Sequence, residues 1–172
     1  MSLAPITDKA MGNLGYERVD NDHYPTPEWC TEAVIPFIAK RILVDDTVHE
    51  VAAGAGDMQR VLERWFRKVV GQDIVNYGWG DTDCFELVNF LTDNRHKDAI
   101  VTNPPYTLAE EFVRHALKVT YPRKGMVAML MRNEWDSAKT RGDLFARHPA
   151  FAEKVVLTKR PRWVKDSTGS PR

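Results

Sequence analysis

The chain has 172 residues, of which 43% are hydrophobic and 28% charged, and this make-up is typical of one globular domain rather than of a disordered or fibrous chain. No run approaches the roughly 18 apolar residues that a bilayer span needs, so we expect a cytoplasmic protein with no membrane partner. The net charge of zero is a cancellation, because residues 1–50 carry four Lys or Arg against nine Asp or Glu, whereas residues 103–172 carry fourteen against seven. Only the last segment would attract a polyanion such as nucleic acid.

The amino-terminal region divides into an arm and the start of the domain. Residues 1–23 mix Gly, Asn and Asp with few apolar positions, which predicts a flexible arm ahead of a single domain over 24–172. Thr26-Pro27-Glu28 is typical of a helix start with Thr26 as the N-cap. Because proline lacks the N–H that a helix interior needs, we expect a kink or a restart at Pro36. The predicted buried face of this helix comprises Trp29, Ala33 and Phe37.

A strand, a glycine loop and a helix follow. Residues 47–53 form an apolar run that predicts a short buried strand, and Gly54-Ala55-Gly56 leads from it to Asp57, the expected cap of the next helix. Residues 68–72 predict a second strand that ends at Asp73, and residues 85–90 predict either a short strand or a helix start. The second helix's predicted core face comprises Met58, Val61, Leu62 and Trp65.

The carboxyl-terminal half continues the alternation of strands and helices. Residues 99–102 predict a strand, and Thr107-Leu108-Ala109-Glu110 has the spacing of a capping box at the start of a helix. Further strands are expected at residues 126–131 and 154–157. This alternation predicts an α/β fold with a mostly parallel sheet and helices on both faces. The predicted core stripe of the last helix comprises Leu108, Phe112, Ala116 and Val119.

Polar residues stand at the expected carboxyl ends of the strands, where ligands bind in such sheets. Glu50 and Asp57 flank the glycine loop, and Asp73 follows about twenty residues later, the place of an acid that accepts hydrogen bonds from ribose hydroxyls. The loop lacks the Lys-Ser/Thr of a phosphate loop, and its acids would repel a pyrophosphate. A positively charged cofactor such as S-adenosylmethionine suits it better, which favours methyl transfer over hydride transfer. A plain strand-to-helix turn would show the same glycines.

Asn103-Pro104-Pro105-Tyr106 is the most informative segment of the sequence. The two prolines fix the backbone and leave the Asn103 and Pro104 oxygens as acceptors for the two N–H bonds of a planar amino group. The nitrogen lone pair could then be directed at an electrophile, and Tyr106 offers a ring on which a base can stack. The alternative is a Pro-Pro loop with a packed tyrosine.

Residues 24–163 resemble the S-adenosylmethionine-dependent DNA adenine-N6 methyltransferases, in particular the short phage-type adenine methylases. Residues 24–29 resemble the family's cofactor segment, with Tyr24, Thr26 and Pro27 as the matching residues. Residues 50–56 resemble its glycine loop, with Glu50, Ala53, Gly54 and Gly56. The proline usual after the loop acid is Val51 here. By the same resemblance Asp73 is the ribose acid, Asp83 beside Cys84 contacts the cofactor adenine, and Asn103, Pro104, Pro105 and Tyr106 form the catalytic tetrapeptide.

The resemblance implies a Rossmann-like methyltransferase fold and a metal-free reaction without a covalent intermediate. The target adenine would be flipped out of the DNA duplex and stacked on Tyr106. Its amine, held by the Asn103 and Pro104 oxygens, would attack the methyl group of the sulfonium in line. The family's usual final hairpin is not evident before Arg172, so either the sheet is one strand short or the tail lies beyond this sequence.

Contacts to DNA are expected from the basic carboxyl-terminal region. The candidates are Arg132, Lys159, Arg160 and Arg162. Only about twenty residues separate the helix after Tyr106 from each neighbouring strand, so a separate recognition domain does not fit. Sequence choice would come from residues 132–150, from the arm, or from another protein, which includes a second copy in a homo-oligomer.

Two alternatives to DNA adenine methylation stay open. An Asn-Pro-Pro-Tyr site also resembles that of enzymes that methylate a protein glutamine amide or an adenine in RNA. The chain could also be a non-catalytic module that retains the cofactor pocket, although the intact tetrapeptide argues against that. The five histidines lack metal-ligand spacing, and the two cysteines cannot build a zinc cluster, so we expect no metal site.

Overall fold

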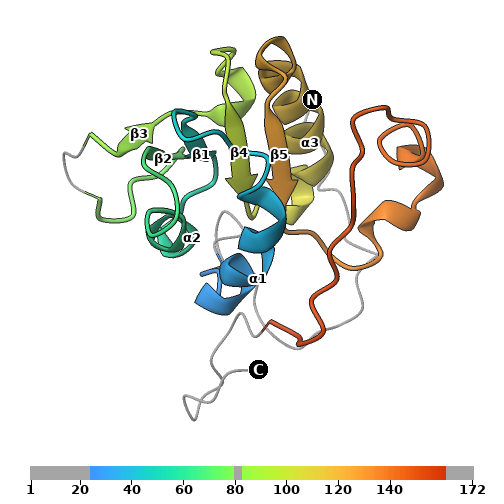
Figure 1. The fold of residues 1–172 in the computed structure, drawn as a ribbon, viewed down its shortest axis with the longest axis horizontal. Helices are drawn as coiled ribbons and strands as arrows, with labels where there is room; N and C mark the ends of the chain where they lie inside the picture. The colour runs from blue at the N-terminus through green and yellow to red at the C-terminus, as the bar shows by residue number, and fades with distance from the viewer. Residues whose placement is uncertain (1–23, 80–82, 162–172) are drawn as a thin grey trace, which may run out of the picture.

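The computed structural model describes residues 24–79 and 83–161, which form a five-stranded sheet with helices on both faces (Figure 1). All the pairings between the strands are parallel, in the order β3-β2-β1-β4-β5. The predicted α/β fold with a parallel sheet is confirmed. The strands are β1 (Val48–Glu50), β2 (Val69–Asp73), β3 (Phe85–Leu87), β4 (Ala99–Thr102) and β5 (Met126–Met129).

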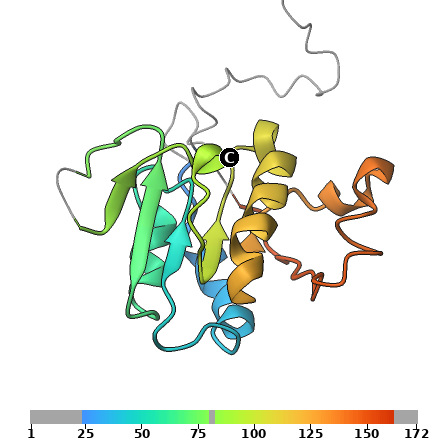
Figure 2. The same cartoon turned by 90° about the horizontal axis from the view of Figure 1, so that it is seen from above.

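The described residues form three α-helices and several short 3-10 helices, most of which lie between strands. The α-helices are α1 (Glu28–Ile38), α2 (Asp57–Leu62) and α3 (Ala109–Thr120). The 3-10 helices are η2 (Phe90–Thr92), η3 (Tyr106–Leu108), η4 (Tyr121–Arg123), η5 (Trp135–Ser137) and η6 (Lys139–Arg141). Helices α1 and α2 contribute to one core cluster, while α3 and η2 contribute to another. The sheet therefore carries a separate core on each face, which agrees with the arrangement in Figures 1 and 2.

Strand β4 lies between these two cores. Ala99 and Val101 pack with α1 and α2, whereas Ile100 packs with α3, because successive side chains of a strand point to opposite faces. All four residues of β4 are buried. A strand buried on both faces has a continuous apolar sequence rather than an alternating one, which is why residues 99–102 were predicted with the correct bounds.

The helix starts differ from the predicted caps. Pro27, not Thr26, is the N-cap of α1, and Gly56, not Asp57, is the N-cap of α2. The predicted capping box at 107–110 is wrong as well, because Thr107 lies within η3 and α3 begins only at Ala109, without a side-chain cap. In each case tertiary contacts or backbone geometry set the helix start, and a local capping signal could not reveal this. The structure places Thr26 instead at the candidate active site described below.

The predicted buried faces of the helices are only partly correct. In α1 the buried residues are Cys30, Thr31, Ile35 and Ile38, whereas Trp29, Ala33 and Phe37 are only half-buried. The helix continues through Pro36 to Ile38 without a restart. Trp65 lies beyond the end of α2 with 60% of its surface exposed, and Leu108 precedes α3 and is also exposed. The remaining predicted core positions of these two helices are buried.

Residues 131–161, which we call the outer segment, lie beside β5 and α3 on the side of the sheet away from β3 (Figures 1 and 2). The sixth strand predicted at 154–157 is wrong, since the outer segment contains only η5 and η6 among turns and irregular chain. Exposed ion pairs link it to the rest of the molecule, including Arg114 with Asp143 and Arg41 with Glu153. The outer segment therefore packs against the sheet without extending it.

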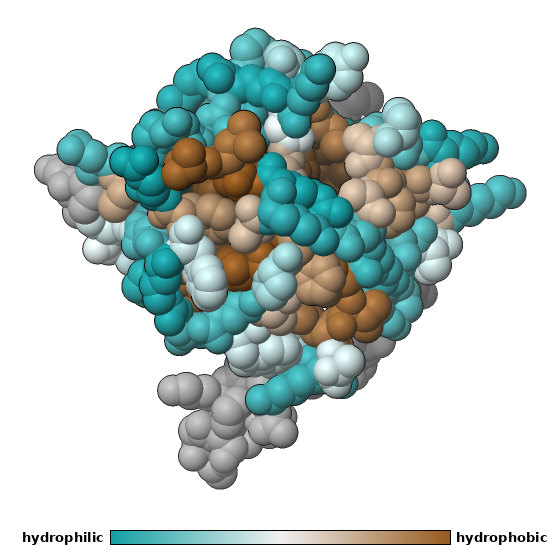
Figure 3. All heavy atoms as spheres, in the orientation of Figure 1, coloured by the Kyte–Doolittle hydropathy of each residue, from teal (hydrophilic) through white to brown (hydrophobic). Residues whose placement is uncertain are grey.

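The face of the molecule seen in Figure 3 is hydrophilic around most of its edge, with apolar side chains exposed in its middle. None of the helices in the described ranges combines the length and the apolar character needed to cross a bilayer. The predicted arm at 1–23 and the predicted DNA contact Arg162 lie outside the described residues.

Candidate active site

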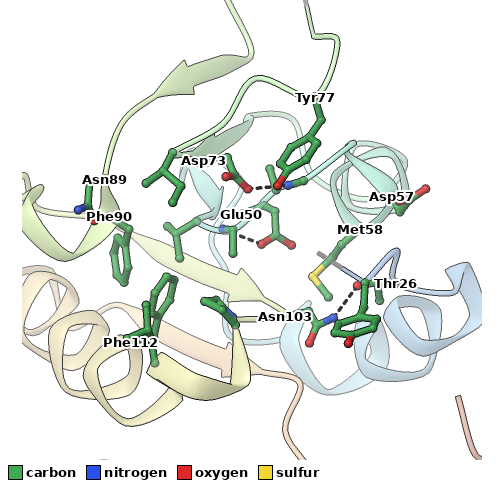
Figure 4. A pocket seen from close by; sticks show the side chains of 18 of the residues that line it. Thr26, Glu50, Asp57, Met58, Asp73, Tyr77, Asn89, Phe90, Asn103 and Phe112 are labelled. Carbon is green, nitrogen blue, oxygen red and sulfur yellow. Dashed lines mark hydrogen bonds between the residues drawn. The ribbon is translucent and has the colours of Figure 1, made fainter. Parts of the chain in front are cut away.

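The carboxyl ends of β1, β2 and β4 meet at one edge of the sheet, where a cavity of about 160 Å³ opens to solvent. We call this cavity the main pocket (Figure 4). Segments that are far apart in the sequence meet there, as expected for a ligand site at the edge of a parallel sheet. The predicted site residues that line it are Tyr24, Thr26, Glu50, Ala53, Gly54, Asp73, Asn103 and Pro105.

The glycine loop after β1 is bonded to the end of β2. Gly54 has a φ of 51°, in the region that favours glycine, and its N–H donates to Asp73 Oδ2 at 2.8 Å. The other oxygen of Asp73 accepts from the N–H of Val75 at 3.1 Å. Two backbone donors thus orient the Asp73 carboxylate, and each of its oxygens keeps a further lone pair for a ligand hydroxyl.

Trp79 holds the same loop from outside, a role that a tryptophan in a predicted loop does not reveal. Its ring N–H donates to the Gly54 carbonyl at 2.7 Å, and the ring stacks on Phe85 with the centroids 5.1 Å apart. Gly56 has a φ of 84°, and a Cβ at this position would collide with the Trp79 ring. Gly56, a predicted cofactor contact, therefore packs beneath Trp79 and starts α2 but does not line the main pocket.

Glu50 ends β1 as a buried acid, with 1% of its surface exposed. Its Oε1 accepts hydrogen bonds from the Thr102 hydroxyl and, at 3.2 Å, from the N–H of Ala52. Burial, together with the smaller effect of the nearby Asp73 charge, raises the pKa of Glu50 to about 8 in spite of these two bonds. Near neutral pH the carboxyl is therefore mostly protonated, and a positive charge brought into the pocket would favour its ionised form.

Asn103 stands directly after β4, at the centre of the site. Its amide nitrogen donates to the Thr26 hydroxyl at 3.1 Å, as Figure 4 shows. Its side-chain oxygen is buried and has no hydrogen-bond partner among the described residues. An unpaired buried acceptor costs about 1–3 kcal/mol, so this oxygen is prepared for a donor that a ligand would bring. Pro105 lines the pocket beside it, and Pro104 is buried behind.

Tyr106 does not line the main pocket. It begins η3 and borders a second hollow on the other side of the tetrapeptide, together with residues of α3 and of the outer segment. The guanidinium carbon of Arg132 lies 5.2 Å from the centroid of its ring. The four tetrapeptide residues are thus divided, with Asn103 and Pro105 at the main pocket and Tyr106 at the second hollow.

The wall of the main pocket opposite Asn103 comes from the chain after β3. Val88, Asn89, Phe90 and Leu91 line it, and Phe90 packs on Phe112 with ring centroids 5.1 Å apart. The sequence analysis missed all four of these residues. The signal was weak, because Asn89 lies inside the range 85–90 that predicted either a strand or a helix start, so the end of this strand could not be located from the sequence.

Asp83 and Cys84, the predicted adenine contacts, are absent from this lining. They precede β3, whose first residue, Phe85, is paired with Gly71 in the middle of β2. The pocket lies beyond the other end of these strands. The structure therefore places Asp83 and Cys84 at the amino end of β3, and Asn89 at the carboxyl end where a ligand contact is expected.

A buried ionic cluster holds the chain that follows Asn89. Lys97, only 2% exposed, donates to Asp93 Oδ2 at 3.0 Å, and Arg95 donates to both oxygens of the same carboxylate at 2.8 Å. Arg95 also pairs with Glu86 of β3. These partners, Arg95 first, hold the pKa of Asp93 well below its usual range. The cluster thereby ties the turn at the end of η2 to the edge of the sheet.

The predicted nucleic-acid contacts are held by different parts of the molecule. Arg132 lies against Tyr106, whereas the Lys159 ammonium is 5.3 Å from the centroid of the Trp29 ring in α1. Arg160 is exposed, with no ion pair to another residue of the described ranges. Of these basic residues, the structure places Arg132 beside Tyr106 of the Asn103-Pro104-Pro105-Tyr106 segment.

The main pocket can hold a ligand with three different parts. The residues after β3 form an apolar slot for a flat ring, Asp73 accepts from hydroxyl groups, and Glu50 with Asp57 supplies acids for a positive charge. Residues 24–79 and 83–161 contain no group of three His, Cys, Asp or Glu side chains placed to hold a metal ion.

No protein-family model and no curated protein matches the sequence of the chain. Among solved structures, a candidate RNA methyltransferase from Pyrococcus horikoshii is similar over 77% of this chain and 72% of its own, with a TM-score of 0.54 and 14% identity. The 23S rRNA methyltransferase ErmE is similar over 69% of this chain, with a TM-score of 0.50 and 21% identity, and the chain spans about half of it, 51%. These likenesses confirm the Rossmann-like methyltransferase fold expected from the sequence.

Proposed function

We propose that the chain is an S-adenosylmethionine-dependent methyltransferase that acts on the exocyclic amino group of adenine in DNA. The observation that supports this most directly is the buried, unpaired side-chain oxygen of Asn103 at the end of β4. The amide nitrogen of the same side chain donates to the Thr26 hydroxyl. This bond fixes the orientation of the amide and leaves its oxygen available as an acceptor. An acceptor fixed in this way suits a planar NH₂ group.

The residues of the main pocket fit the proposed cofactor. Asp73 would accept from the ribose hydroxyls, the slot at Asn89, Phe90 and Leu91 would hold the adenine ring, and Glu50 would face the positive charge. When bound, S-adenosylmethionine supplies a methyl group on a positively charged sulfur, which a nitrogen lone pair can attack. The positive charge of the cofactor matters, because it would stabilise the ionised form of the Glu50 carboxyl, which burial disfavours.

The chain's own contribution to the reaction is positioning. Asn103 would accept one N–H of the target amine and the Pro104 carbonyl the other, while the proline rings keep both oxygens in place. With its hydrogens held, the amine would direct its lone pair toward the pocket lined by Glu50 and Gly54. Tyr106 would support the target ring from the outer side of the tetrapeptide.

An adenine in RNA is the second candidate acceptor, since the two solved structures compared above are described as RNA methyltransferases. A protein glutamine amide is a third, because it offers a similar NH₂ group. The carboxyl-terminal excess of basic residues favours a nucleic acid over a protein.

The test is methyl transfer from labelled S-adenosylmethionine to DNA, RNA and protein acceptors, followed by identification of the modified atom. We expect label at adenine N6 in DNA. Asn103→Ala should abolish transfer while the affinity for S-adenosylmethionine, measured by calorimetry, stays within a few-fold. The matched control is Asn133→Ala, an exposed asparagine of the outer segment, which should transfer methyl groups like the parent protein.

Each part of the proposal can fail separately. Label on RNA alone or on glutamine alone would replace the acceptor and keep the chemistry. Full activity of Asn103→Ala would refute the catalytic role of the tetrapeptide. A parent protein that binds S-adenosylmethionine but labels no acceptor would favour the non-catalytic module.

A further inference from the structure

The second hollow, of about 330 Å³, lies between the start of α3 and the outer segment. It shares Tyr106 with the catalytic tetrapeptide but none of the residues that line the main pocket. Pro105 borders the main pocket and Tyr106 borders this hollow, so the two cavities adjoin at consecutive residues. If one residue of a polymeric substrate places its target group at Asn103, the next residue of that polymer would therefore lie at the second hollow.

Aromatic rings with guanidinium groups against them form part of the walls of the hollow. The Arg141 guanidinium carbon lies 4.4 Å from the centroid of the Trp135 ring, and that ring is held edge-on by Phe145 at 5.6 Å. Tyr106 on the other side has Arg132 against it at 5.2 Å. Bases of unpaired nucleotides stack on such aromatic rings and on guanidinium planes.

The hollow also contains two carboxylates in different states. Glu110 is engaged by Arg114, which donates to its Oε1 from two nitrogens, at 3.0 and 2.9 Å. Glu111 forms no ion pair with another of the described residues. The two acids in the lining are balanced by the guanidinium groups of Arg114 and Arg141, so the hollow offers a phosphate no net attraction, whereas a free carboxylate accepts two parallel N–H bonds well. The hollow therefore suits the edge of a base better than the backbone of a nucleic acid.

Arg141 supplies the complementary donors. Its Nε donates to the Trp135 carbonyl at 2.8 Å, and the bond holds the guanidinium plane in place. The two terminal NH₂ groups make no further hydrogen bond to the described residues. A fixed guanidinium with free terminal groups can donate to two adjacent acceptors of one base.

We infer that the second hollow binds an unpaired guanine adjacent to the target adenine. Guanine combines two adjacent donors, N1–H and the 2-amino group, on one edge with two adjacent acceptors, O6 and N7, on another. Glu111 would accept from the first edge, and Arg141 would donate to the second. This inference rests on the proposed methyl transfer, and it assigns the choice of sequence to α3 and the outer segment.

The probes are short single-stranded oligonucleotides, in DNA and in RNA, that contain one adenine in a pyrimidine context. The residue on its 5′ or its 3′ side is guanine, inosine, 7-deazaguanine or a pyrimidine. Affinity is measured by fluorescence anisotropy in the presence of S-adenosylhomocysteine, and kcat/KM by transfer of labelled methyl groups. We expect guanine on one side to be favoured over inosine and over 7-deazaguanine by about ten-fold each, because each analogue lacks one of the recognised groups.

Two variants separate the two edges. Glu111→Gln should lose the preference for guanine over inosine and keep that over 7-deazaguanine. Arg141→Lys keeps the charge but loses the planar donor pair, so it should show the opposite pattern. Glu134→Gln and Arg147→Lys are matched controls, since both residues lie in the outer segment but not in the lining of the hollow, and both preferences should persist in them.

The results distinguish this inference from the proposed function. Tight binding of the guanine probes without methyl transfer to any probe would refute the methyltransferase activity and keep the guanine site. Methyl transfer that is independent of both neighbouring bases, or preferences unchanged in Glu111→Gln and Arg141→Lys, would overturn the guanine site. A preference found only with the RNA probes would assign the flanking guanine to RNA.

Discussion

The region around β1, β2 and β3, which we call the cofactor side of the sheet, and the outer segment are held in place by different kinds of contact. Around β1, β2 and β3 the polar groups are buried and bonded to one another, as in the pair of Lys97 with Asp93 and the bond from Thr102 to Glu50. The outer segment is held by exposed ion pairs, such as that of Lys154 with Asp136, and by a small group of aromatic rings. Buried polar groups are costly to disturb, whereas exposed pairs contribute little.

Because of this difference, we expect the stability of the fold to depend on the cofactor side and the choice of substrate sequence to depend on the outer segment. A change on the cofactor side should disturb folding or the main pocket, because the same bonds that stabilise the sheet edge also hold Asp73, Asn89 and Glu50. A change in the outer segment should leave the fold intact and affect the second hollow. The following predictions test that separation, beginning with the largest expected effect.

Removal of the Asp93 charge should have the largest effect on stability. Asp93→Asn leaves the Lys97 ammonium buried without its counter-charge, and breaking a buried pair in this way costs about 3–5 kcal/mol. Urea denaturation measures the loss. The matched variant is Asp143→Asn, which breaks the exposed pair with Arg114 and should leave the denaturation midpoint unchanged. Equal effects of the two substitutions would show that the two regions are held alike.

Loss of the Asp73 carboxylate should weaken the cofactor site more than the fold. Asp73→Ala removes the acceptor for the proposed ribose hydroxyls and also releases the N–H of Gly54 from its bond across the loop. We expect affinity for S-adenosylhomocysteine to fall at least about ten-fold, since a hydrogen bond to a charged group contributes roughly 1.5–3 kcal/mol. Calorimetry gives the affinity, and Asp45→Ala, an exposed acid far from the pocket lining, serves as the control.

Glu50 should make the stability of the cofactor side depend on pH. Its pKa rises from the ordinary value of 4.5 to about 8 in the folded chain, so the folded state binds the proton more tightly. This contribution to stability is complete below pH 4.5 and is lost as the pH rises toward about 8. Glu50→Gln cannot ionise and should therefore gain stability relative to the parent as the pH is raised through this range. Urea midpoints at both ends of the range measure this, and a constant difference between the two proteins would contradict it.

The sequence predicted β4 with the correct bounds because all four of its residues are buried, and a strand buried on both faces is a continuous apolar run. The apolar residues at 155–157 suggested a further strand that the outer segment does not form. The caps of α1 and α2 were each predicted one residue away from their place, because Pro27 and Gly56 cap these helices without a side-chain hydrogen bond that the sequence could signal.

The same limit explains which site residues were found. Asp73 and Asn103 directly follow the strands predicted at 68–72 and 99–102, and Glu50 was found because it precedes the glycine loop. All three line the main pocket. The end of β3 was ambiguous, so Asp83 was chosen at one end of it and Asn89 was missed at the other. The buried pair of Asp93 and Lys97 left no signal, because charged residues in a polar stretch normally lie in solvent.

Removal of a ring from the outer segment should have the smallest effect on the whole molecule. Phe145 is half-buried and meets both Trp135 and Phe151 edge-on, with centroids 5.6 and 5.1 Å away. Phe145→Ala should release the Trp135 wall of the second hollow and make residues 131–161 more sensitive to limited proteolysis. Hydrogen exchange of the β1 and β4 amides should stay slow, because both strands lie inside the two cores on the sheet faces. Faster exchange in those strands would mean that the outer segment supports the sheet, and the separation of stability from selectivity would then be lost.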